Sequence, residues 1–199
     1  MAKRGTKTVW PFKKPKTDPR NGRLVFLIEC LTNQNARDIG AAESPAFTQE
    51  LMELLVDAET GIVQIPCPEI ACLGFERSRS SGQSIRQALE TPEATACCHS
   101  LASATAERIH CYVKQDFEVL AVLGGNEQSP GCAVHTAGNS EVQLTHKSGV
   151  FMKMLAAELT QGGLHIRFHG MRDADSELLQ EDLKWVRDRL HSREATSRG

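Results

Sequence analysis

Three of the seven cysteines stand where a predicted strand ends, each within a short motif of its own. Cys30 lies in residues 29–35 (ECLTNQN), Cys67 in residues 64–69 (QIPCPE) and Cys132 in residues 128–132 (QSPGC). They are 37 and 65 residues apart, so only the tertiary fold can bring them together. A parallel α/β sheet does so, because its ligand sites form outside the carboxyl ends of the strands. Three converging thiolates predict a metal centre with one unfilled coordination position, and therefore an enzyme.

Iron–sulfur clusters fit this donor set best, since they are held by cysteine thiolates, usually four for a 4Fe–4S cubane. Three ligands would leave one iron open as a Lewis acid, and its softness favours sulfur. Taken singly, cysteines beside strands are most often plain core residues. Cys72 is a weaker candidate as a spare ligand, and Cys97, Cys98 and Cys111 are predicted to be core or surface thiols.

The same motifs resemble the thiouracil desulfidases, most closely a shorter, single-domain branch of desulfidase-related proteins. The resemblance spans about residues 24–170 and rests on Cys-Leu-x-Asn-Gln-Asn at 30–35, Gln-x-Pro-Cys-Pro-Glu at 64–69 and Ser-Pro-x-Cys at 129–132. It implies that Cys30, Cys67 and Cys132 bind a 4Fe–4S cluster whose free iron takes the thiocarbonyl sulfur of a thiolated pyrimidine. Two positions differ from that branch: Glu29 replaces a common His, and residues 129–133 read Ser-Pro-Gly-Cys-Ala instead of Ser-Pro-Ser-Cys-Gly.

Replacing C=S by C=O requires a water to attack carbon and a sulfide to leave, and Glu69 is the carboxylate expected to activate that water. Its alternative role is to cap the following turn. Ser129 is expected to orient the substrate or the leaving sulfide, or else to be a turn residue before a proline. Glu29 follows a buried strand, so it needs either a partner or a function. Four amide side chains are expected to meet the pyrimidine edge or, alternatively, to shape their own segments: Asn33, Gln34, Asn35 and Gln64.

Two other functions remain open from the residues alone. One is a metal- or sulfur-binding sensor or structural module. The other is a metal-free nucleotide hydrolase or transferase that uses Glu69 at the same edge of the sheet. His135, three residues after Cys132, is a further candidate ligand or proton carrier, and Arg77 and Arg79 are candidates to bind a nucleotide phosphate.

The composition is that of a globular protein with a basic N-terminal arm and no membrane-spanning stretch. The chain has 199 residues, 40% of them hydrophobic and 24% charged, which is ordinary for a globular domain. Residues 1–23 hold eight Lys or Arg and one acidic residue, so this arm is either a solvated segment or a contact for RNA phosphates. No stretch is long and apolar enough to span a membrane, and we expect no membrane partner. Seven cysteines without a signal peptide predict reduced thiols in a cytoplasmic protein rather than a disulfide framework.

Alternating apolar strands and amphipathic helices must position these groups. Strands are predicted at residues 24–28, 62–65, 119–124 and 164–168, and helices at 47–58, from 91 to about 116, 147–160 and 176–190. Residues 73–92 are predicted to be a polar connection whose Arg-Ser-rich part acts as a lid. This order predicts an α/β, Rossmann-like three-layer sandwich with a mostly parallel sheet of about four to five strands. We expect residues 1–23 to be a basic arm and 24–199 one desulfidase-like domain.

Overall fold

The computed structural model describes residues 18–192, so most of the basic arm lies outside the described residues. Four strands form the sheet: β1 (Arg23–Ile28), β2 (Gly61–Ile65), β3 (Glu118–Gly124) and β4 (Phe168–Gly170). The longer helices are α2 (Gln49–Asp57), α5 (Pro92–Lys114), α6 (Val150–Gln161) and α7 (Ser176–His191). Short helices occupy the connections: α1 (Glu29–Thr32), η1 (Gln34–Ala36), α3 (Pro68–Leu73) and α4 (Ile85–Leu89).

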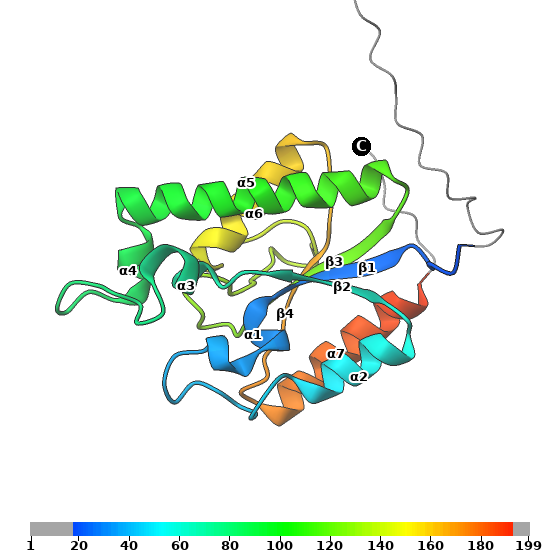
Figure 1. Cartoon of the computed structure of the whole chain (residues 1–199), viewed down its shortest axis with the longest axis horizontal. Coiled ribbons are helices and arrows are strands. Elements are labelled where there is room, and N and C mark those ends of the chain that lie inside the picture. Colours follow the sequence, from blue (N-terminus) through cyan, green and yellow to red (C-terminus); the bar gives the residue numbers. More distant parts are fainter. Residues whose placement is uncertain (1–17, 193–199) are drawn as a thin grey trace, which may run out of the picture.

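The sheet has the order β2-β1-β3-β4, and all neighbouring strands are parallel. Helices α5 and α6 cover one face, and α2 and α7 cover the other (Figure 1). This arrangement confirms the predicted α/β sandwich with a parallel sheet. Because the strands are parallel, α1, α3 and the segment after β3 all begin at the same edge of the sheet.

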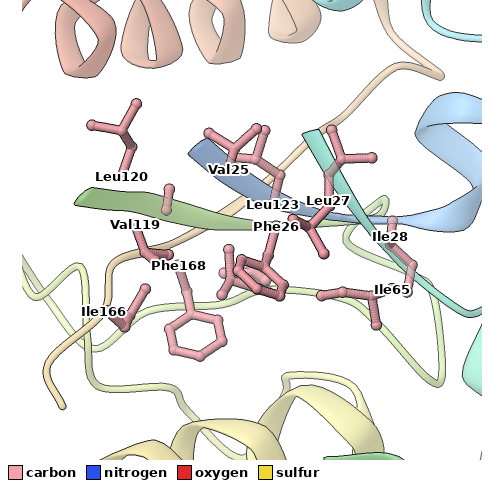
Figure 2. Packing of buried hydrophobic residues seen from close by; sticks show 14 of the residues in the cluster. Val25, Phe26, Leu27, Ile28, Ile65, Val119, Leu120, Leu123, Ile166 and Phe168 are labelled. Atoms are coloured by element: carbon pink, nitrogen blue, oxygen red, sulfur yellow. The ribbon is translucent and has the colours of Figure 1, made fainter. Parts of the chain in front are cut away.

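The central strands β1 and β3 are buried on both faces beneath these helices, as their apolar runs predict, whereas the edge strand β2 has exposed residues. Phe26, Leu27 and Ile28 of β1 are almost completely buried. Figure 2 shows that Val25 and Leu27 point to one side of the sheet, while Phe26 points to the other together with Phe168. This alternation, which every strand imposes on its side chains, lets one strand contribute to both halves of the core.

The last strand begins later than predicted. Its ladder with β3 runs from Val122↔Phe168 to Gly124↔Gly170, whereas apolar residues had predicted a strand over 164–168. Leu164 and Ile166 are buried, but the backbone N–H of Phe168 donates to the carbonyl of Glu141. The apolar pattern therefore indicated that residues 164–168 are buried, but not which of them pair with β3.

The predicted lid is also different in structure. Residues 73–92 contain the end of α3 and the whole of α4, which begins with a capping box formed by Ser84 and Gln87. Arg77 is only 3% exposed, so this part of the connection is anchored to the body of the protein. None of the helices described between residues 18 and 192 is long and apolar enough to cross a membrane.

Candidate functional site: a cavity lined by three cysteines

A cavity of about 240 Å³ lies at the carboxyl edge of the sheet, and Cys30, Cys67 and Cys132 all line it. We call it the cysteine cavity. Cys30 lies in α1 directly after β1, Cys67 is the N-cap of α3 after β2, and Cys132 follows β3. The other residues that line it are Ile28, Ala36, Arg37, Asp38, Ala41, Glu69, Arg77, Ile85, Gly125, Asn126, Ser129 and Pro130. The structure thus brings together the three cysteines, Glu69 and Ser129, which the sequence had singled out.

Glu29 connects two of these segments. Its Oε2 accepts a hydrogen bond of 2.9 Å from the backbone N–H of Cys67. The carboxylate at the end of β1 therefore holds the turn that ends β2, and this contact supplies the partner that a charge in this position requires.

Glycines allow the segment after β3 to approach the other two. A Cβ atom at Gly125 would lie 2.8 Å from the sulfur of Cys132, and one at Gly131 would lie 2.7 Å from Cγ of Pro68. Both distances are shorter than carbon contacts in packed proteins. Gly131 therefore leaves room for the start of α3 beside Cys132.

Burial makes all three thiols poor acids. It raises the pKa of Cys30 to about 11, raises that of Cys67, and raises that of Cys132 well above its usual value. The neighbouring thiols contribute to the effect at Cys132, because a second negative charge nearby disfavours its ionisation. The thiols are therefore protonated when nothing is bound, and a metal that binds their sulfurs must displace these protons.

A chain of hydrogen bonds joins the carboxylate, the hydroxyl and one thiol. Ser129 Oγ lies 3.4 Å from Glu69 Oε1 and 3.0 Å from the sulfur of Cys132. The other oxygen of Glu69 accepts a bond of 2.9 Å from Nε of Arg77. Arg77 has a backbone φ of +48°, which non-glycine residues rarely adopt, and it also donates to the carbonyl of Ala36. Its guanidinium thus orients Glu69.

Arg37 and Asn126 are cavity residues that the sequence analysis missed. Both side chains donate to Asp173, whose carboxylate is buried just beyond β4. Nη2 of Arg37 lies 2.7 Å from Asp173 Oδ1, and Nδ2 of Asn126 lies 2.9 Å from the same oxygen. For Asn126 the available signal was its position two residues after the third predicted strand, whereas Arg37 carries no comparable local signal.

The four predicted substrate amides do not line the cysteine cavity. Gln34 is 2% exposed and donates to the carbonyl of Cys30 and to Asp173. Asn33 caps η1 by accepting from Asn35, and Gln64 accepts from the hydroxyl of Thr32. These amide groups therefore have the second role expected from the sequence: they shape their own segments and do not face a ligand in the cysteine cavity.

Two further expectations need correction. Cys72 and Cys97 form a disulfide between α3 and α5, so the prediction that all cysteines are reduced is wrong for this pair, and Cys72 is no spare ligand. The cysteines are 25 residues apart, and only the packing of α3 on α5 brings them together. His135 lies outside the cysteine cavity, and its Nε2 bonds the carbonyl of Glu127 at 2.8 Å.

The three cavity cysteines are the kind of donor that holds an iron–sulfur cluster. No group of three or more His, Cys, Asp or Glu side chains in residues 18–192 is placed to hold one metal ion. In a cubane each thiolate binds a different iron, so its ligands stand farther apart than those of one ion. Three soft sulfur donors around one cavity supply the ligands that such a cluster requires.

Comparison with known proteins gives one informative similarity. Over 112 residues the chain is 25% identical to an uncharacterized protein of Methanocaldococcus jannaschii, which covers 56% of this chain and 68% of that protein. No family model matches the chain, and no solved structure matches it significantly.

Proposed function

We propose that this protein is an iron–sulfur-dependent desulfidase that converts the C=S group of a thiolated pyrimidine base or nucleotide to C=O and releases sulfide without net redox change. The proposal draws on the resemblance to thiouracil desulfidases. The observation that carries it is the convergence of Cys30, Cys67 and Cys132 on one cavity together with Glu69 and Ser129. Cys30, Cys67 and Cys132 are free thiols, and we also propose a cytoplasmic location, where such thiols stay reduced and the Cys72–Cys97 disulfide would be a transient one.

Cys30, Cys67 and Cys132 would hold a 4Fe–4S cluster. When bound, it would supply an open iron that attracts the thiocarbonyl sulfur. Glu69 would take a proton from the attacking water, and its ion pair with Arg77 fixes the direction of the carboxylate. Ser129, between Glu69 and Cys132, would donate its hydroxyl hydrogen toward the departing sulfur. The oxygen of the added water becomes the carbonyl oxygen of the pyrimidine, and its two hydrogens leave with the sulfur as hydrogen sulfide.

Substrate recognition is reassigned on the basis of the cavity lining. Asn126 and Arg37, whose side chains carry N–H donors, line the cavity, whereas the amides predicted from the sequence do not. Both side chains are held by Asp173, so they are oriented before a ligand arrives. The basic arm, through which RNA would bind, lies largely outside the described residues.

The test is sulfide release by the full-length chain, reconstituted with iron and sulfide without oxygen and then given 2-thiouracil or a thiouridine nucleotide. We expect turnover with the intact protein and loss of bound iron in Cys67→Ser. Glu69→Gln should retain its iron and lose about 10²–10⁴-fold in kcat, because it cannot accept the proton of water.

Glu29→Gln is the matched control, since its side-chain oxygen can still accept the Cys67 N–H bond while the charge is removed. Its kcat should stay within a few-fold of the parent. Intact iron–sulfur absorption without sulfide release from any thiolated pyrimidine would reject this substrate class. Activity that survives chelation in a colourless protein would instead favour a metal-free hydrolase.

A further inference from the structure

A second group of cysteines lies between α3 and α5. Cys72 and Cys97 form a disulfide, and the sulfur of Cys98 lies 3.6 Å from that of Cys72. Neighbouring residues of a helix normally point in different directions, yet both Cys97 and Cys98 reach the same sulfur. Cys72 is therefore in contact with two alternative partners.

The two partners differ in their surroundings. Cys97 is partly exposed, whereas Cys98 is completely buried. The side chains packed around Cys98 are apolar and do not titrate: Leu73 from α3, Ile85 and Leu89 from α4, and Val150 and Met154 from α6. Reagents in solution therefore meet Cys97 first.

We propose that Cys72, Cys97 and Cys98 form a thiol–disulfide exchange centre, in which Cys72 passes between an outer linkage to Cys97 and an inner linkage to Cys98. In the exchange the thiolate of Cys98 attacks the sulfur of Cys72. The Cys72–Cys98 bond forms, the Cys72–Cys97 bond breaks, and Cys97 leaves as a thiolate that takes up the proton lost by Cys98. No electrons enter or leave.

A soluble dithiol connects this centre to its surroundings. One of its thiolates attacks the partly exposed sulfur of Cys97 and releases Cys72 as a thiol. Its second thiol then frees Cys97 and closes the reagent into a disulfide. The dithiol is oxidised by two electrons, and Cys72–Cys97 is reduced by two.

The linkage also acts on the cysteine cavity. The helix α3 has only six residues, begins after Cys67 and contains Glu69 as well as Cys72. A bond from Cys72 to α5 therefore fixes the helix whose N-cap, Cys67, and first-turn residue Glu69 line the cavity. The exchange itself does not depend on the proposed iron site, so either inference can fail without the other.

The experiment maps the linkages of the full-length chain in graded mixtures of oxidised and reduced dithiothreitol. Samples are quenched in acid, alkylated and digested, and fragmentation between residues 97 and 98 distinguishes the two linkages. We expect both Cys72–Cys97 and Cys72–Cys98 in the parent protein. We expect Cys72–Cys98 alone in Cys97→Ala, and an unchanged pattern in Cys111→Ala, which removes an exposed cysteine from the same helix.

The pH dependence provides a second measurement. Burial raises the pKa of Cys98 to about 11, so its thiolate, the attacking group, is scarce at neutral pH. Raising the pH from about 7 to 9.5 should thus speed the approach to equilibrium between the two linkages by about 10²-fold, because the thiolate fraction of Cys98 rises with pH.

Cys72–Cys97 as the sole linkage of Cys72 in the parent protein at every mixture and pH would overturn the proposal. So would the absence of any Cys72 linkage. Folded Cys97→Ala with both remaining thiols free under the most oxidising conditions would also overturn it. If Cys97→Ala does not fold, the presence or absence of the Cys72–Cys98 linkage in the parent protein decides whether the proposal holds.

Discussion

At the scale of single residues, Gly131 is where the segment after β3 packs against the start of α3. A Cβ atom at Gly131 would lie 2.7 Å from Cγ of Pro68, so a side chain there would collide with the proline ring. The proline ring is stiff, and Pro68 is itself buried at the start of α3. The glycine and Pro68 therefore fit one another, and this fit places Ser129 and Cys132 beside Glu69.

We expect Gly131→Ala to lower the free energy of unfolding by about 1–3 kcal/mol, because the added methyl overfills a closely packed contact. Urea denaturation measures this change. Gly170→Ala is the control, since its new carbon would meet neighbours at 3.4–3.5 Å, which is ordinary contact. Equal stabilities of the two variants would mean that the loop moves aside at little cost.

At the scale of elements, Asp173 joins segments that are remote in sequence. It accepts hydrogen bonds from Arg37 after η1, from Thr48 before α2 and from Asn126 after β3. The side chains of the Arg37–Asp173 pair are 8% and 3% exposed, so the pair is shielded from solvent and salt. This contact closes the segment after Cys30 against the edge of the sheet.

Asp173→Ala should therefore destabilise the fold by about 3–5 kcal/mol, because it leaves the Arg37 charge buried and unpaired. The double variant Arg37→Met with Asp173→Leu should recover much of this loss, since it buries no charge. Chemical denaturation of Asp173→Leu, Arg37→Met and the double variant that combines them tests the coupling. Additive effects of the two changes would show that the residues do not act as a pair.

At the scale of the whole molecule, two contacts attach the last helix to the sheet. Arg23 of β1 donates to the carbonyls of Leu190 and Ser192 near the end of α7. The completely buried Asp182 of α7 accepts from His169 of β4 at 2.8 Å and from the backbone N–H of Arg172 at 2.7 Å. Burial opposes ionisation of Asp182, but these hydrogen bonds prevail and lower its pKa.

The lowered pKa makes stability depend on acid. Ionised Asp182 contributes to the free energy of unfolding. This contribution is fully present above the pKa of an aspartate in the unfolded chain, about 3.9, and is lost as the pH falls through the lower pKa of Asp182 in the folded protein. Asp182→Asn should be less stable than the parent at pH 7, and the difference should shrink below about pH 4. Thermal unfolding of both proteins between pH 3 and 7 measures this, and a constant difference would contradict the assignment.

Local pattern in the sequence by itself determined the class of fold, the four longer helices and three of the four strands, because apolar periodicity reflects which side of each segment is buried. It also placed three cysteines at strand ends, and parallel pairing then implies a common edge. Tertiary structure alone decided which polar groups meet: Glu29 with Cys67, Glu69 with Arg77, Asp173 with Arg37, and Cys72 with Cys97. These partners depend on how the chain folds back on itself, and a short hydrogen bond or disulfide requires an accuracy that residue spacing does not contain.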